Sequence, residues 1–425
     1  MESAAERFLR DNGLHADTVD FDAQARRFAE QMRAGLRGEE SGLPMLPTYV
    51  DAGAPLPRGK SAVAIDAGGT NLRVALVRFG EDGRAEVVGQ KTVPMPGSRK
   101  ETTARAFFAA LADYAAPLAG ESEALGFGFS FPCEILPNRD GRILRFCKEV
   151  RVSGGENAEM GASLNEALLA AGQRPKRITV VNDTLAGMLA GIAAGTGRPC
   201  ANFIGLICGT GLNMCYCERT SNIVKLGLAE PPSMAVNTEC GMYAGFARSA
   251  CDEALDAKTG SPGDHQFEKM AGGAYLGPLA LECLRLAAEQ NLFDAATADK
   301  IFALKRLESH ELDRLLEDVP GSQLAALCGT EGALETMRTL CGGIYDRAAK
   351  LMAVAVFAVV RQCGGGRGEA PVCIFAEGST FYRANRFQAR LEGFLAPKCA
   401  GAGLHYVFQK PAASNLVGAA AAALM

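Results

Sequence analysis

The chain has 425 residues, 48% of them hydrophobic, and a formal net charge of −4. This length exceeds what one core of typical size supports, so two domains are expected. The acidic balance, with Lys and Arg spread along the chain, argues against nucleic acid as a partner, because phosphate binding requires a basic face. The longest apolar run, residues 351–360, is too short to span a bilayer, so no membrane partner is expected.

The 14 cysteines form no regular disulfide framework, and the opening "MESAAERFLRDNG" lacks the apolar core of a signal peptide. This pattern predicts reduced thiols in a cytoplasmic protein. Cys208, Cys215 and Cys217 come closest to metal-ligand spacing, but they fall in an expected strand–turn–strand, where Cys is a small buried filler. We expect structural thiols there, although an oxidation-sensitive turn is also compatible with the pattern.

The expected elements alternate between helical and strand-rich blocks along the chain. Residues 1–40 show helical spacing of apolar residues, and a Pro-rich connector leads into a strand-rich block at 61–95. A helix is expected over 102–119, and Asp140-Gly141 marks a hairpin. Residues 177–195 predict a buried strand that runs straight into a small-residue helix.

The C-terminal half is mostly helical. From Pro262 to about residue 362 the spacing predicts helices, and Gly364–Gly366 form a flexible join. The stretch "APVCIFAEGSTFYRA" is one more buried strand that ends in a Gly turn. The final stretch, "SNLVGAAAAALM", predicts a helix whose Ala and Gly residues let it pack closely against a neighbouring helix or sheet.

One pattern occurs twice. "AIDAGGTNLRV" and "IGLICGTGLNMCY" each consist of an apolar strand, a turn with Gly, Thr and Asn, and a second strand. Two such units, well separated in the chain, indicate two related lobes with a ligand held between the two turns.

The composition of these turns suits a phosphate. Gly68, Gly69, Gly209 and Gly211 let backbone N–H groups approach an anion closely, and Thr70 and Thr210 add hydroxyl donors. Asp66 precedes the first turn and is suited to hold Mg²⁺ through water, because hard cations take oxygen ligands. Neither turn matches the P-loop or dinucleotide-binding spacing, so the sequence predicts a phosphate site of another type.

Two further segments carry polar residues. In "VVNDTLAG", Asp183 follows a buried strand and is either the N-cap of the next helix or a catalytic carboxylate, and the residues alone leave both roles open. Glu239 and Glu268 lie among apolar residues, and Asn182, Asn213 and Asn237 supply amides in the same segments. Carboxylates and amides together suit a polyol, because each hydroxyl is both a donor and an acceptor.

Taken in this order, the segments resemble those of a hexokinase of the actin-like ATPase superfamily, nearly from end to end. "IDAGGTNLRV" and "GLICGTGLNMCY" are similar to the two phosphate motifs, and "VVNDTLAGM" to the segment with the catalytic Asp. "GFGFSFPCE", "VNTECG" and "FEKMAGGAYLG" resemble the sugar-site segments, and "FAEGSTFYRANRF" the adenosine motif.

The resemblance implies ATP-dependent phosphorylation of a hexose, most naturally glucose, at its 6-hydroxyl, with ATP and Mg²⁺ as cofactors. Asp183 would be the base, and Asp66 would organise Mg²⁺. Ser130, Lys148, Asn182, Asn213, Glu239 and Glu268 would hold the other hydroxyls. The phosphates and nucleotide would contact Gly68, Gly69, Thr70, Asn71, Arg73, Gly209, Thr210, Gly378 and Ser379.

The implied fold is α/β, with two RNase H-like lobes and a cleft between them. The small lobe would comprise residues 60–195 and 413–425, and the large lobe residues 1–45 and 196–412. We expect a cytoplasmic monomer or homodimer that takes part in glycolysis.

Some residues depart from the family pattern. Cys147 replaces a sugar-binding Thr, which leaves mannose, fructose or an N-acetylhexosamine open as the substrate. Glu377 stands where Asp is common. Because a fold does not dictate function, the same architecture would also suit a non-catalytic sugar sensor or an actin-like ATPase without a small substrate.

Overall fold

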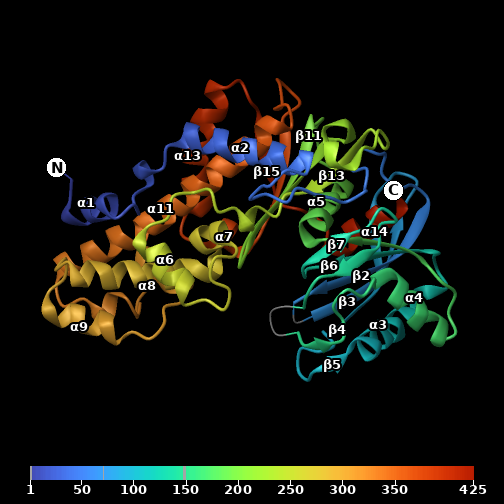
Figure 1. The fold of residues 1–425 in the computed structure, drawn as a ribbon, viewed down its shortest axis with the longest axis horizontal. Helices are drawn as coiled ribbons and strands as arrows, with labels where there is room; N and C mark the ends of the chain where they lie inside the picture. Colours follow the sequence, from blue (N-terminus) through green and yellow to red (C-terminus); the bar gives the residue numbers. More distant parts are fainter. Residues whose placement is uncertain (1, 70, 147–149) are drawn as a thin grey trace.

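The computed structural model describes residues 2–69, 71–146 and 150–425 and contains two main β-sheets (Figure 1). In the first sheet the strand order is β10 (Arg177–Val181), β6 (Ala124–Phe129), β2 (Lys60–Gly68), β3 (Asn71–Phe79) and β4 (Ala85–Pro94). Strands β2, β3 and β4 form an antiparallel meander, while β6 runs parallel to β2, and β10 parallel to β6.

The second sheet repeats this plan. Its order is β1 (Leu46–Pro47), β13 (Ser233–Asn237), β12 (Leu212–Arg219), β11 (Asn202–Cys208), β14 (Val372–Glu377) and β15 (Tyr406–Gln409). Strands β11, β12 and β13 are antiparallel, and β14 and β15 follow parallel to β11. Apart from the short β1, the two sheets share order and direction, which confirms the prediction of two related α/β lobes made from the repeated turns.

Two small ladders complete the strands. β5 (Thr102–Thr103) pairs with β9 (Val152–Ser153), and β7 (Cys133–Ile135) pairs antiparallel with β8 (Gly141–Ile143). The second ladder is the hairpin predicted at Asp140-Gly141.

Helices cover the outer faces of both sheets (Figure 1). On the first sheet, α3 (Ala104–Ala119) and α4 (Met160–Ala170) enclose an apolar core with one face of β2, β3 and β6. On the second, α2 (Phe21–Arg37), α11 (Glu331–Gln362) and α13 (Phe387–Gly401) pack together, with the long α11 at the centre. The predicted helices at 1–40, 102–119 and beyond Pro262 are confirmed.

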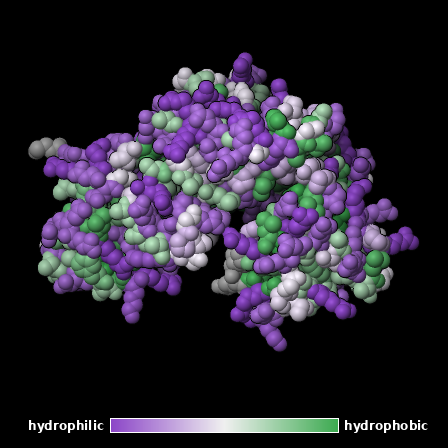
Figure 2. Space-filling view, in the orientation of Figure 1, coloured by the Kyte–Doolittle hydropathy of each residue, from purple (hydrophilic) through white to green (hydrophobic). Residues whose placement is uncertain are grey.

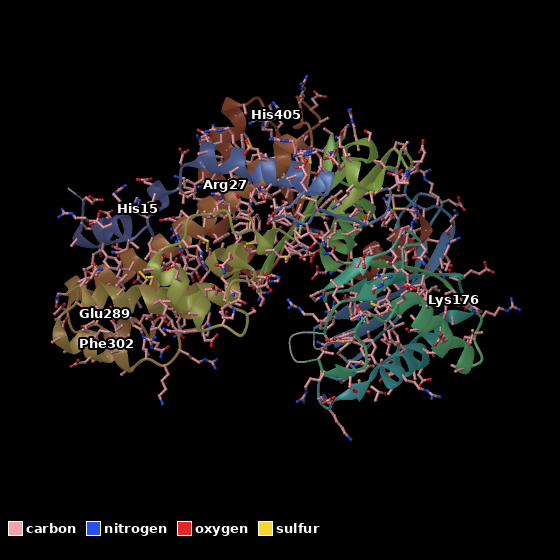
Figure 3. The ribbon with its side chains drawn as sticks, in the orientation of Figure 1. His15, Arg27, Lys176, Glu289, Phe302 and His405 are labelled. Carbon is pink, nitrogen blue, oxygen red and sulfur yellow. The ribbon has the colours of Figure 1, made fainter. Side chains whose placement is uncertain are left out.

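Further helices pack around this core. They are α1 (Ala4–Asp11), α6 (Ala250–Ala257), α7 (Gln266–Ala271), α8 (Gly273–Glu289), α9 (Ala295–Ala303), α10 (Ser309–Leu316) and α12 (Ser379–Arg383). Figure 2 shows a deep indentation between this helical part and the part built on the first sheet. In Figure 3, Glu289 and Phe302 mark the far end of the helices, and Lys176 lies at the opposite end of the molecule. Among the described residues, no helix has the length and apolar character needed to cross a bilayer.

Two helices rich in small residues lie between the sheets. α5 (Asp183–Ala194) packs on the second sheet, α14 (Asn415–Leu424) packs on the first, and the two helices contact each other. The packing is close because glycines leave side chains out of it. A methyl group added at Gly418 of α14 would overlap the backbone of Ala186 in α5, and one added at Gly126 of β6 would overlap that of Ala419 in α14. This confirms the expected close packing of the last helix, while the exact limits of the two lobes stay a prediction.

We expect the substitution Gly418→Ala to lower the free energy of unfolding by about 1–3 kcal/mol, the usual cost of overpacking. The added carbon would lie 2.6 Å from the carbonyl carbon of Ala186. The overlapped atoms are backbone, which cannot turn aside as the end of a flexible side chain could. The matched control is Gly393→Ala in α13, where no heavy atom lies within 4 Å of the added carbon. There the better helix propensity of Ala should stabilise the protein by about 0.5–1 kcal/mol. Calorimetric melting temperatures that shift in the same direction for both variants would contradict this account.

Candidate active site

The first predicted turn joins β2 to β3 at the end of the first sheet. Gly68 pairs with Asn71, and Asp66 pairs with Arg73 across the hairpin. Gly69 has a φ of 62°, in the left-handed region that glycine adopts without strain, and no heavy atom lies within 4 Å of where its Cβ would be. The tip of this hairpin is therefore open to a ligand, and Asn71 and Arg73 are exposed beside it.

The second predicted turn joins β11 to β12 in the same way. Its carbonyl oxygens accept hydrogen bonds from neighbouring helices: Gly273 N and Ala274 N, at the start of α8, donate to Gly209 O at 2.8 Å and Thr210 O at 3.0 Å. The Thr380 hydroxyl of α12 also donates to Gly209 O at 2.8 Å. These bonds hold the backbone of the turn in place, and the Thr210 side chain remains exposed.

The predicted nucleotide residues Gly378 and Ser379 lie next to this second turn. Gly378 has a φ of 115°, and an added Cβ would overlap the backbone of Cys208, so only glycine fits here. Ser379 is exposed and begins α12. The structure thus brings Gly209, Thr210, Gly378 and Ser379 together at the end of the second sheet.

Asp183 is the first residue of α5, and the residue before it caps the helix. Asn182 Oδ1 accepts a hydrogen bond from Leu185 N at 2.9 Å, which is the N-cap interaction. Asp183 Oδ1 accepts from Thr184 N at 2.8 Å. Of the two roles that the sequence left open for Asp183, the N-cap therefore belongs to Asn182.

Three carboxylates from different elements lie within electrostatic range of Asp183. Burial raises the pKa of Asp66, and the charge of Asp183 adds to the shift, while Arg73 Nη1, 3.3 Å from Asp66 Oδ2, opposes it. Burial and the charges of Asp183 and Asp66 raise the pKa of Glu377 to about 7. Burial, with smaller effects from Asp183 and Glu268, also raises the pKa of Glu239. Negative charge is concentrated here, and a proton or a cation would relieve the repulsion.

A chain of amides and carboxylates lines the second lobe. Asn213 Nδ2 donates to Asn237 Oδ1 at 2.9 Å, and Asn237 Nδ2 donates to Glu239 Oε1 at 2.6 Å. Glu239 has a φ of 50°, which is uncommon outside glycine and typical of functional sites. Glu268 Oε2 accepts from Leu212 N at 2.9 Å, so this carboxylate is fastened to the second turn. Asn213, Glu239 and Glu268 therefore belong to one polar surface.

The first lobe adds Ser130, at the end of β6. Its hydroxyl and the Asp66 carboxylate both lie 3.6 Å from the position that a Cβ on Gly68 would occupy, so Ser130 adjoins the first turn. Three further predictions, the phosphate contact Thr70, the sugar contact Lys148 and the substituted position Cys147, lie outside the described residues.

Two residues of this site were not among the predicted site residues. The sequence marked Asn237 as a nearby amide, but its bridging position follows from the pairing of β12 with β13. Glu377 stood out only as a departure from Asp. The available signal was its position directly before Gly378. The parallel pairing of β14 with β11 places Glu377 beside Ile207 and so brings it close to the second turn.

The donor set of this site fits a hard cation. Asp66 and Asp183 offer carboxylate oxygens, which Mg²⁺ prefers. Within residues 2–69, 71–146 and 150–425, no group of three or more His, Cys, Asp or Glu side chains is placed to hold a metal ion by itself. A magnesium ion here would therefore take most of its ligands from water and phosphate oxygens.

The three cysteines near the second turn are buried or nearly so. Burial raises the pKa of Cys208 and Cys215 well above the ordinary value, and that of Cys217 to about 12. The reactive thiolate form is therefore scarce, which agrees with the prediction of structural thiols.

Comparison with known proteins gives one consistent result. Residues 203–425 match a family model described as Hexokinase, and residues 6–193 match a second model with the same description. Hexokinase-3 of Rattus norvegicus is 32% identical over 401 residues, which are 87% of this chain and 42% of the relative. Hexokinase-1 of Schizosaccharomyces pombe is 29% identical over 390 residues, 86% of this chain and 79% of the relative. The chain spans less than half the length of the mammalian relatives it matches.

The solved structure of a hexokinase from Schistosoma mansoni, complexed with glucose, has a TM-score of 0.80 to this chain at 23% identity. The match covers 99% of this chain and 98% of that one, and it shows that the two share a fold.

The raised pKa of Glu377 predicts a pH-dependent effect on stability. Its folded-state pKa of about 7 exceeds the ordinary 4.5, so the native state binds this proton more tightly than the unfolded state does. Stability is lost as the pH rises through this window, because the native carboxylate ionises at a cost. We expect Glu377→Gln to raise the melting temperature more at pH 8 than at pH 5.

The matched control for this measurement is Glu335→Gln, which removes an exposed charge from α11. An equal shift at both pH values for Glu377→Gln, or the same pattern in the control, would show that the buried charge is not the cause.

Proposed function

This chain belongs to the hexokinase family, and we propose that it transfers the γ-phosphoryl group of ATP to the 6-hydroxyl of a hexose, with glucose preferred. The products would be hexose 6-phosphate and ADP. The observation that carries the proposal is the convergence of Asp183, at the start of α5, with Glu239 and with Glu377, at the end of β14 beside the second turn. The proposed base, the polar surface of the second lobe and the second turn thereby lie close together, which supports the proposal.

The sugar would lie on the polar surface of the second lobe. Each hydroxyl needs an acceptor for its proton and a donor for its oxygen, and Glu239, Asn213 and Glu268 supply carboxylate oxygens and an amide there. The Asn237 bridge holds Asn213 and Glu239 in a fixed relation, which limits the reorganisation needed on binding. Ser130, Asn182 and Lys148 would complete the contacts from the first lobe.

Asp183 would act as the base that takes the proton of the 6-hydroxyl. A base must lie within reach of the proton it takes, and Asp183 lies where the elements that carry Asp66, Glu239 and Glu377 meet. Phosphoryl transfer has a loose transition state in most cases, so placing the hydroxyl in line with the phosphate should matter more than proton removal.

The phosphates of ATP would lie between the two turns. Gly68, Gly69, Thr70, Asn71 and Arg73 would contact them from the first lobe, and Gly209 and Thr210 from the second, with Gly378 and Ser379 beside the nucleoside. Asp66 would hold Mg²⁺ through water, and the ion would supply charge neutralisation for the phosphate oxygens. Closure of the lobes on the sugar would expel water, which otherwise competes as the acceptor.

This activity would place the protein at the entry of glucose into glycolysis in the cytoplasm. The described cysteines are free thiols, which suits a reducing compartment.

The testing experiment is a coupled assay of ADP release with ATP and Mg²⁺ against glucose, mannose, fructose, N-acetylglucosamine and no sugar. We expect glucose-dependent release, with the other sugars ranked below it. Release that ignores sugar would indicate another actin-like ATPase. No release, with glucose still raising the melting temperature, would indicate a sugar sensor.

In the same assay, Asp183→Ala should lower kcat by about 10²–10⁴-fold, the usual contribution of a general base. Glucose binding, measured by calorimetry, should persist. The matched control is Asp294→Ala, which removes the N-cap of α9 remote from the site and should cost about 1 kcal/mol of stability with kcat unchanged. If Asp183→Ala lowered the melting temperature but left kcat unchanged, as is expected of the control, the base assignment would be wrong.

A further inference from the structure

Two buried ion pairs extend from α6 on successive helical turns. Asp252 binds Arg347 of α11 through hydrogen bonds of 2.7 and 2.6 Å, and Asp256 binds Lys269 of α7 at 2.5 Å. All four residues are almost fully buried, with exposed fractions of 1% for Arg347, 2% for Lys269, 4% for Asp252 and 7% for Asp256. Each pair joins an Asp of α6 to a basic residue of another helix. Only the second pair reaches α7, the helix that carries Glu268.

The Lys269 ammonium group organises the loop before α7. It donates to Ser261 O at 2.6 Å as well as to Asp256, and the other oxygen of Asp256 accepts from Gly263 N at 2.9 Å. Burial alone would raise the pKa of Asp256, but the hydrogen bonds from Lys269 and Gly263 outweigh it and lower the pKa to about 2. The Asp256 carboxylate therefore stays ionised, and its bonds tie residues 258–265 to the end of α6.

α7 needs such an attachment because it has only six residues. A helix this short has almost no stability of its own, so tertiary contacts decide its position. Adjacent side chains on a helix diverge by roughly 100°, so Lys269 enters the interior while Glu268 extends to Leu212 at the second turn. Any rotation of α7 that displaced Lys269 would move Glu268 as well.

The chemistry of the pair favours a geometric role. A buried ion pair is a poor source of stability, because desolvation of both charges offsets their attraction, and apolar residues of similar volume often serve as well. An ion pair does, however, require a particular separation and direction of its two charged groups.

We propose that Lys269 and Asp256 are positioning residues for the sugar site, holding α7 so that the Glu268 carboxylate meets a hexose hydroxyl. This assignment rests on the proposed function and adds to it two residues that touch neither substrate nor nucleotide. Their loss should weaken sugar binding much more than ATP binding. Gly378 and Ser379 lie on other elements, and the start of α8 and Thr380 of α12 also hold the second turn through Gly209 and Thr210.

The test replaces each pair by apolar residues. Lys269→Met with Asp256→Leu removes the pair that leads to α7, and Arg347→Met with Asp252→Leu removes the matched pair that leads to α11. Glucose affinity is measured by calorimetry without nucleotide, and KM for glucose, KM for ATP, kcat and the melting temperature are measured for each protein. We expect the first variant to raise the glucose Kd and KM at least about tenfold, with KM for ATP within about twofold of the original. The second variant should change the melting temperature and leave the glucose Kd within about twofold.

An equal loss of glucose affinity in both variants would overturn the assignment, because general loosening would then explain it. An unchanged glucose Kd in the first variant would overturn it as well. If that double variant does not fold, Asp256→Asn keeps an acceptor for Gly263 N but weakens the bond from Lys269. It should raise the glucose Kd about threefold, and an unchanged Kd would be equally decisive. Absence of glucose binding by the unsubstituted protein would instead refute the proposed function itself.

Discussion

The close contact between α5 and α14 is the constraint on which the arrangement of the molecule depends. The two helices lie between the sheets, α5 on the second and α14 on the first, and their backbones approach directly because Gly418 carries no side chain. Protein interiors are packed like organic crystals, so this contact sets the spacing of the lobes to within a fraction of a side chain. Asp183 begins α5, and its distance from the first sheet, which α14 covers, therefore depends on this helix contact.

The site itself combines groups that repel one another. Asp66 and Glu377 share a partly buried region with Asp183, and burial raises the pKa of both. A folded protein tolerates such crowding only where the surrounding structure compensates for it, and functional sites are where this is usually found. A bound cation would neutralise the same charges, so the mutual repulsion of these carboxylates favours a site that holds a cation.

The two-lobed architecture could be predicted because the repeated turns are local signals in the sequence. The two sheets repeat the same strand order, in agreement with them. The sequence left Asp183 as either the N-cap of the helix or a catalytic carboxylate, because Asp caps helices well and only the backbone conformation shows that Asn182 is the cap. Glu377 was missed because its proximity to Asp183 depends on how β14 pairs with β11 and on the space that Gly187 leaves. The link between Lys269 and Asp256 depends on the packing of α7 against α6, which no local pattern encodes.

The position of α14 also has a consequence for folding during translation. The last strand of the first sheet ends at Val181, yet the helix that covers the inner face of that sheet begins at Asn415. The ribosome therefore completes all five strands long before it synthesises α14. Until then the apolar residues of β2 and β6 that pack against α14 stay exposed. Nascent chains at this stage expose a sheet face that favours aggregation, so chaperone binding should concentrate between the synthesis of β10 and that of α14.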